Sequence, residues 1–181
     1  PAPGGGSVSA YMGSMGVALG TMVANLSSHK RGWDDRWEEF SRHAEEGKAL
    51  QEELLFLVDE DTRAFNKIME AFSLPKNSPE DQVRRKEAIA GATMGAIRIP
   101  FRVMEAAHRG FQLAGAMARE GNPNSVSDAG VGALAMLACV EGAMLNVRIN
   151  AAGMENEKEV AEILLKADDI LHTSRQEKEE I

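Results

Sequence analysis

The chain is poor in cysteine, in aromatic residues and in positive charge. One cysteine in 181 residues excludes an intramolecular disulfide, and aromatic residues make up only 5%. A β-sandwich would need more aromatic and β-branched residues, and a hydrophobic content of 44% argues against disorder. Because 28 acidic residues outnumber 20 basic ones, giving a net charge of −8, neither nucleic acid nor an anionic membrane surface is an expected partner.

Residues with metal-ligand spacing are missing as well. The histidines His29, His43, His108 and His172 are scattered, and none stands beside Cys139 in a zinc-binding pattern. Cys139 lies in an apolar stretch, where a free cysteine is usually a small buried hydrophobe. A secretory signal would have a basic segment before its apolar region, and no such segment precedes the first apolar run here. We therefore expect a cytoplasmic protein without a metal.

The first 28 residues carry no charge and hold six of the 17 glycines. Bulky residues recur there every three or four positions and form one stripe of a helix: Val8, Met12, Met15, Leu19, Met22 and Leu26. Residues 7–28 are long enough to span a bilayer, but they include many polar groups and lack flanking basic and interfacial aromatic residues. We predict a buried central helix of a soluble protein with a small-residue face, and a membrane protein is the weaker alternative.

The rest of the sequence also follows helical periodicity. Ser78-Pro79 has the residues of an N-cap and a first helical position. Pro100 is expected to kink or break its helix, because its ring clashes with the Ala96 carbonyl and it has no N–H.

There is no strand pattern and no internal repeat. We predict an all-α, single-domain bundle over residues 1–181 with five or six helices, the glycine-rich helix lying inside together with a later one. The later helices are expected near residues 33–72, 78–97, 103–121, 127–152 and 157–179.

Asp61 interrupts an apolar stripe. Core positions 54, 58, 65, 68 and 72 predict an apolar residue at position 61. A lone buried carboxylate costs several kcal/mol unless it is paired or protonated. A structural ion pair and a general acid or base are both compatible with this placement.

Polar residues also mark the helix near residues 127–152. Arg148 shares an azimuth with Glu141, so it can neutralise that carboxylate or hold a carboxylate of a substrate. Asn146 and Asn150 stand one turn apart and form an amide pair suited to helix contacts or to a ligand. Asp128 shares the azimuth of Asn146 but lies 18 residues away, about 27 Å along the axis, so the two cannot serve one small site within a subunit.

Two polar loops open the two buried helices. Residues 3–7, Pro-Gly-Gly-Gly-Ser, lead into a helix N-terminus, where free N–H groups and the helix dipole favour an anion; a plain linker has the same composition. Residues 122–128 place five polar side chains at a helix start, for which ordinary capping is the alternative.

Five stretches carry a family resemblance: PAPGGGSVSA (1–10), VDEDTRAFN (58–66), IPFRVMEAA (99–107), GNPNSVSDAGVGA (121–133) and EGAMLNVRIN (141–150). In these stretches the chain resembles the C-terminal domain of formiminotransferase-cyclodeaminase and its standalone bacterial relatives. Those relatives are formimidoyltetrahydrofolate cyclodeaminases and methenyltetrahydrofolate cyclohydrolases.

The resemblance implies an all-helical homodimer that acts on tetrahydrofolate one-carbon units, with no cofactor beyond the folate substrate. A cyclodeaminase converts 5-formimidoyltetrahydrofolate into 5,10-methenyltetrahydrofolate and ammonia. A cyclohydrolase adds water to the same methenyl carbon to give 10-formyltetrahydrofolate. A formiminotransferase is a conceivable partner, and a non-catalytic helical folate-binding or assembly module is a further alternative.

The resemblance and the spacing together point to Asp61 as the acid or base, with Asp128 as the second candidate. The implied substrate-binding residues are Gly4, Gly5, Gly6, Ser7, Asn122, Asn124, Ser127, Asn146 and Arg148. Because one subunit cannot bring Asp128 and Asn146 together, we expect a pocket assembled from two subunits.

Overall fold

The computed structural model describes residues 2–154 and 157–181, so Pro1 of the first family stretch lies outside it. The described residues form five long α-helices and one short 3-10 turn and contain no β-strand, which confirms the all-α prediction. The helices are α1 (Gly5–Ser28), α2 (Trp37–Ser73), α3 (Pro79–Glu120), α4 (Val126–Ala151) and α5 (Lys158–Glu180), with the turn η1 (Pro123–Ser125) before α4.

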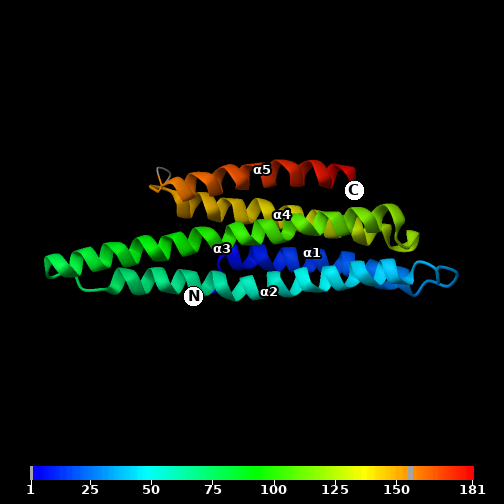
Figure 1. The fold of residues 1–181 in the computed structure, drawn as a ribbon, viewed down its shortest axis with the longest axis horizontal. Helices are drawn as coiled ribbons and strands as arrows, with labels where there is room; N and C mark the ends of the chain where they lie inside the picture. The colour runs from blue at the N-terminus through cyan, green and yellow to red at the C-terminus, as the bar shows by residue number, and fades with distance from the viewer. Residues whose placement is uncertain (1, 155–156) are drawn as a thin grey trace.

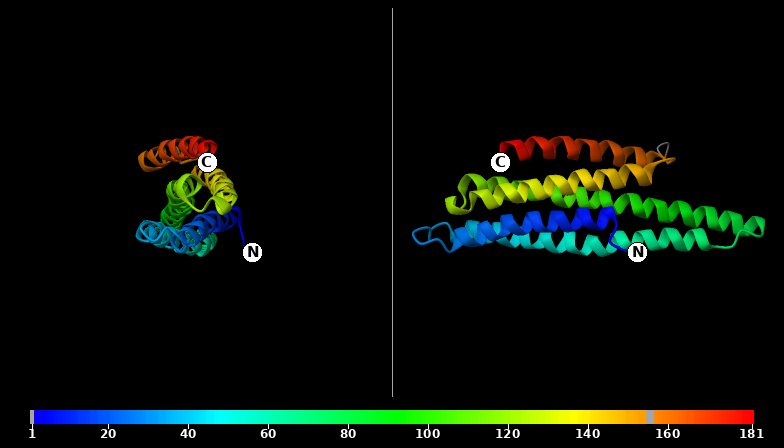
Figure 2. Two further views of the ribbon diagram at one scale, coloured as in Figure 1. Left: turned by 90° about the vertical axis from the view of Figure 1, so that its right-hand side faces the viewer. Right: turned by 180° about the vertical axis from the view of Figure 1, so that it is seen from behind.

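The helices lie side by side along one long axis, and successive helices run in opposite directions (Figure 1). α1 packs against α2, α3 and α4, whereas α5 packs against α3 and α4 and lies on the outside of the bundle (Figure 2). The joined ends of α2 and α3 project beyond the other helices at one end. α1 therefore occupies the inner position expected for the glycine-rich segment.

The helices α1 and α4 touch through their backbones. A Cβ atom on Gly16 would lie 2.6 Å from the carbonyl oxygen of Gly132, and a Cβ on Gly132 would lie 2.8 Å from the carbonyl oxygen of Gly16. Gly13 faces the sulfur of Cys139 in the same interface. Cys139 is fully buried, and burial raises the pKa of its thiol to about 12, in keeping with its predicted role as a small hydrophobe.

Pro100 does not break its helix, so of the two predicted effects, a kink or a break, the break into two helices is wrong. α3 runs without a break from Pro79 to Glu120. The Ala96 carbonyl, which has lost its usual donor at position 100, accepts a hydrogen bond of 2.8 Å from the side-chain Nδ2 of Asn150 on α4. The predicted N-cap of this helix is confirmed, since the Ser78 hydroxyl accepts from the Asp81 N–H at 3.1 Å.

Two segments, Gly5–Ser28 and Pro123–Ala151, are long and apolar enough to cross a membrane by length and composition alone. Core helices of soluble proteins share this composition. In the bundle, 61% of the apolar window of the first segment and 44% of that of the second are buried against other helices.

We expect Gly16→Ala to lower the free energy of unfolding by about 1–3 kcal/mol, because the new methyl group would overlap the backbone of α4. Urea denaturation measures this change. Gly91→Ala is the control, since a Cβ at this exposed position of α3 meets nothing within 4 Å. It should instead raise stability by about 0.5–1 kcal/mol through helix propensity. Equal effects of the two substitutions would contradict the close approach of α1 and α4.

Candidate active site

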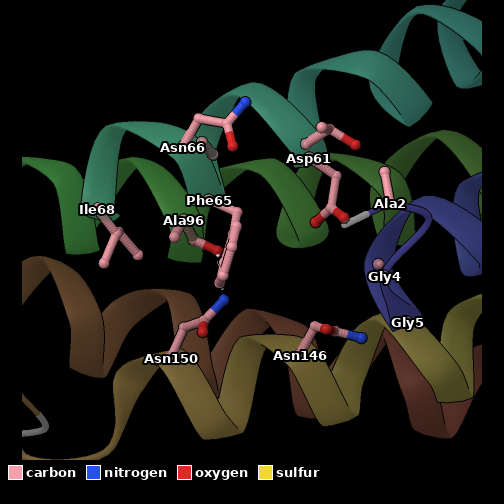
Figure 3. A pocket seen from close by; sticks show the side chains of 13 residues that line it. Ala2, Gly4, Gly5, Asp61, Phe65, Asn66, Ile68, Ala96, Asn146 and Asn150 are labelled. Carbon is pink, nitrogen blue, oxygen red and sulfur yellow. Dashed lines mark hydrogen bonds between the residues drawn. The ribbon is translucent and has the colours of Figure 1, made fainter. Parts of the chain in front are cut away.

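A cavity of about 460 Å³ lies where the N-terminus of α1 meets α2, α3 and α4 (Figure 3). α1 and the segment before it contribute the glycines of the first loop, and α2 contributes one side of the cavity through Asp61, Thr62, Phe65 and Ile68. α4 contributes Asn146 and Asn150 on the opposite side, and α3 contributes Ala96. Residues far apart in the sequence thus converge on one pocket.

Asp61 is held against the first turn of α1. The Ser7 hydroxyl donates to Asp61 Oδ2 at 2.8 Å, and the hydroxyl of Thr62 lies 3.3 Å from that of Ser7. A side chain at Gly6 would overlap the Asp61 carboxylate, so only glycine leaves room for it there. The positive end of the α1 dipole favours a negative group at this place.

The structural alternative for Asp61, an ion pair, is not observed. Among residues 2–154 and 157–181 no lysine or arginine pairs with this carboxylate, and its side-chain partner is the neutral hydroxyl of Ser7. Asp61 is half-buried and lines the cavity. A carboxylate that is anchored on one oxygen and faces a cavity has the geometry of an acid or base.

The two asparagines of α4 are oriented by backbone carbonyls. Asn146 Nδ2 donates to the Gly142 carbonyl of its own helix at 2.9 Å, and Asn150 Nδ2 donates to the Ala96 carbonyl of α3. Asn146 also lies beside Gly5, where a Cβ would be 3.5 Å from Nδ2. The amide pair predicted from the sequence is therefore part of the same pocket as the glycine loop.

Phe65 and Thr62 were not identified as site residues from the sequence. Phe65 belongs to the apolar stripe of α2 and was expected in the core, but it is 51% exposed and projects into the cavity toward α4 (Figure 3). Its spacing is the same as that of true core residues such as Leu54 and Leu57. Phe65 differs from these core residues because α1 begins at Gly5 and leaves this part of α2 uncovered.

The second group of predicted site residues lies at the opposite end of α1. The Asn122 backbone N–H donates to the Ser27 hydroxyl at 2.8 Å, and Asn122 Oδ1 accepts from the backbone N–H of Asn124 at 3.2 Å. Ser127 and Asp128 follow in the first turn of α4. None of these residues lines the cavity, so within one chain Asp128 lies apart from Asn146, as the helical rise predicts, and also apart from Asp61.

Arg148 lies outside the cavity on an exposed face of α4. Its guanidinium pairs with Asp168 of α5 at 2.7 Å. The suggested pairing with Glu141 is wrong, because Glu141 binds Arg175 of α5 at 2.7 Å. Within this chain, Arg148 therefore ties α4 to α5 and contacts no other predicted site residue.

Large apolar side chains remain exposed on α1 and α4, two helices that pack against each other. On α1 they run along the whole helix: Val8, Tyr11, Met15, Met22 and Leu26. On α4 they are Val131, Leu134, Leu145 and Ile149, and they are between 54% and 71% exposed. We call these nine residues the apolar stripe. It runs from the cavity end of the bundle toward the end that holds Asp128, and large exposed apolar side chains gathered on two adjacent helices are typical of an interaction site.

Comparison with known proteins finds one family over nearly the whole chain. The formiminotransferase-cyclodeaminase family matches residues 1–169. A methenyltetrahydrofolate cyclohydrolase from Methylorubrum extorquens is 33% identical over 171 residues, which cover 94% of this chain and 82% of that protein. A formimidoyltransferase-cyclodeaminase from Gallus gallus is 36% identical over 87% of this chain, which spans only 29% of the length of the chicken protein.

A solved structure has the same fold. The formiminotetrahydrofolate cyclodeaminase from Thermotoga maritima superposes with a TM-score of 0.81 and 28% sequence identity, covering 98% of this chain and 86% of that one. The helical architecture is therefore shared along essentially all of the chain.

Gly6→Ala should lower the free energy of unfolding by about 1–3 kcal/mol, because the methyl group would displace the Asp61 carboxylate and break its bond to Ser7. Thermal unfolding checks this. Gly5→Ala serves as the matched control, since its Cβ would make only an ordinary contact with Asn146. If the two neighbouring variants were equally stable, the placement of Asp61 over α1 would be wrong.

Proposed function

The chain belongs to the formiminotransferase-cyclodeaminase family, and we propose that it is a cytoplasmic formimidoyltetrahydrofolate cyclodeaminase that converts 5-formimidoyltetrahydrofolate into 5,10-methenyltetrahydrofolate and ammonia. The relatives are named as enzymes of tetrahydrofolate one-carbon chemistry. The observation that carries the proposal is the Asp61 carboxylate, which is anchored by Ser7, free of an ion pair in the described structure and directed at a cavity large enough for a small ligand.

The reaction requires two proton movements at one carbon. N10 of the folate attacks the carbon of the protonated formimidoyl group on N5, so that a C–N10 bond forms and a tetrahedral intermediate results. A base then removes the proton from N10, and the amino group leaves as ammonia after it has gained a proton. Asp61 can accept the first proton and deliver it to the departing nitrogen, because both nitrogens are bonded to the same carbon. No metal or other cofactor takes part in these steps.

The neighbouring residues would hold the substrate. The glycines of the first loop let a ligand approach the backbone at the N-terminus of α1, where N–H groups are unpaired within the helix. Phe65 offers a flat apolar face, and Asn146 offers a polar group one helix away. These roles are assigned from position, and they agree with the residues that the family resemblance implied at Gly4, Gly5 and Gly6.

The proposal includes a homodimer formed by the apolar stripe. A two-fold axis crossing the middle of the stripe would bring the Asp128 end of one subunit to the Asp61 end of the other, because the two surfaces of such an interface are the same patch turned around. The partner's second polar group would then complete each cavity: Asn122, Asn124, Ser127 and Asp128. The two groups of residues, which lie far apart within one chain, would thus meet across the dimer interface.

A methenyltetrahydrofolate cyclohydrolase is the second candidate. The Methylorubrum extorquens relative with that name is matched over 82% of its length, whereas the chicken cyclodeaminase is a much longer protein with a second activity in its name. The two reactions share the methenyl carbon, and they differ in whether ammonia leaves or water is added. As a cyclodeaminase, this chain would depend on a formiminotransferase to supply its substrate.

Asp61→Asn should reduce kcat by about 10²–10⁴-fold with little change in KM, because the amide cannot shuttle the proton but keeps the shape of the carboxylate. The absorbance of methenyltetrahydrofolate, followed with each of the two substrates, measures both activities. Asp59→Asn is the control, since this carboxylate lies two residues away on the exposed side of α2. A wild-type chain that hydrolyses methenyltetrahydrofolate but forms none of it from formimidoyltetrahydrofolate would favour the cyclohydrolase. Full activity of the Asp61→Asn chain would exclude Asp61 as the acid or base.

Leu134→Glu should convert the homodimer into monomers and lower activity by at least about tenfold, because it places a charge in the centre of the apolar stripe. Sedimentation velocity and the folate assay read out the two effects. Leu165→Glu is the matched control, since Leu165 is 73% exposed but lies on α5, outside the stripe.

Mixing two inactive variants tests whether the site is shared between subunits. Dimers containing one Asp61→Asn chain and one Asp128→Asn chain would have one intact site, so random exchange should restore roughly a quarter of wild-type activity. No recovery after verified subunit exchange would contradict the shared site and leave Asp61 acting within its own chain.

A further inference from the structure

Pro100 creates an unusual carbonyl group in the wall of the cavity. A proline inside a helix has no N–H, so the carbonyl of the residue four positions earlier is left without its helical partner. In α3 that residue is Ala96, which lines the cavity. A carbonyl buried without a partner would cost about 1–3 kcal/mol, so its acceptor has to be satisfied from elsewhere.

Asn150 satisfies this carbonyl and is oriented by it. Its Nδ2 donates to the Ala96 oxygen at 2.8 Å across the α3–α4 interface (Figure 3). Only the amino half of an amide can make this bond, because two oxygens would repel one another. The orientation of the Asn150 side chain therefore follows from its partner. Asn150 lines the cavity, and the other half of its amide, Oδ1, accepts no hydrogen bond from the described residues.

The surroundings of Asn150 Oδ1 suit a flat ring with N–H donors. Asn146, one turn earlier, also lines the cavity and also uses its Nδ2 on a backbone carbonyl, so its Oδ1 is likewise left as an acceptor. Phe65 projects from α2 toward these amides and is half exposed, so one of its faces is free to stack. No cationic side chain lines this cavity within the described part of the chain. A neutral heterocycle suits these surroundings, because its flat ring can stack on the aromatic face while the N–H groups along its edge donate to the acceptors.

We propose that Asn150 is a specificity-determining residue that accepts a hydrogen bond from an N–H of the pterin ring, and that Pro100 positions it for this role. This assignment rests on the proposed function. The pterin half of a folate has an amino group and ring N–H groups along its edge, whereas the p-aminobenzoyl half has none on its ring. The pterin ring therefore lies between Phe65 and the α4 amides, and the reacting carbon lies toward Asp61.

Asn150 also has a purely structural role, the pairing of the Ala96 carbonyl, and the test must separate the two. Pro100→Ala restores a helical N–H that can pair with that carbonyl, which makes Asn150 dispensable for stability. In this background, Asn150→Asp keeps an acceptor of the same shape, and Asn150→Leu keeps the shape but removes the acceptor. Both double variants should melt within a few degrees of the wild type, while Asn150→Leu alone should melt lower.

The binding probe is 5-formyltetrahydrofolate, in which an oxygen replaces the formimidoyl nitrogen, measured by titration calorimetry. We expect the Pro100→Ala/Asn150→Asp chain to bind within about threefold of the Pro100→Ala chain and the Pro100→Ala/Asn150→Leu chain to bind at least about tenfold more weakly than it, because the pterin donor loses its acceptor. Pro100→Ala alone, which releases the amide from its anchor, should weaken binding severalfold without lowering the melting temperature.

Two outcomes would overturn this assignment, and they are distinguishable. Wild-type affinity in the folded Leu double variant would show that Asn150 only supports α3, while the cyclodeaminase activity of the wild type would stand. A wild-type chain that neither binds 5-formyltetrahydrofolate nor forms methenyltetrahydrofolate would overturn the proposed function and the assignment together. If the double variants did not fold, unchanged affinity of the Pro100→Ala chain would by itself count against the positioning role of Pro100.

Discussion

The backbone contact between α1 and α4 determines where the candidate site residues lie. Gly16 and Gly132 allow the two helices to touch, and this contact sets their register. Because the helices are antiparallel, moving from Gly16 to Gly5 on α1 corresponds to moving from Gly132 to Asn146 on α4, and these residues are neighbours in the cavity. A side chain at the contact would separate the helices and would shift the glycine loop away from both α4 and Asp61.

The same close packing explains how a helix so rich in hydroxyl groups can be buried. The hydroxyls of Ser9, Thr21 and Ser27 each donate to the carbonyl four residues earlier, so α1 satisfies them within its own backbone. Ser7 is in the first turn, where the residue four positions earlier precedes the helix. Its hydroxyl is therefore available to another element, and it donates to Asp61. The start of the helix thus supplies the one buried hydroxyl among these that orients the Asp61 carboxylate at the cavity.

Sequence periodicity predicted the helices and singled out Asp61, because both are local patterns. Asp61 was recognisable as a polar residue at an apolar position, and the separation of Asp128 from Asn146 followed from the rise of one helix. Phe65 could not be recognised, because an aromatic residue on the stripe has the same spacing whether a neighbouring helix covers it or a cavity lies beside it. The fate of the helix at Pro100 could not be predicted either, since the donor that compensates for the proline, Asn150, is 50 residues away and belongs to another helix.

The absence of charge from the first 28 residues has two physical sources. Three neighbouring helices, α2, α3 and α4, surround α1, and a charged side chain on those faces would be desolvated without a partner. The remaining face carries Val8, Tyr11, Met15, Met22 and Leu26 and is exposed in the single chain, where lysine or glutamate would be tolerated. Folding alone therefore does not require that this face be apolar. In the proposed homodimer a second copy of the chain covers this face. A charge would then be desolvated on every side of α1, so the whole helix has to be uncharged. Folding accounts for the absence of charge on three sides of α1, and the proposed assembly would account for it on the fourth. This fourth face runs from the Asp61 end of the bundle to the Asp128 end.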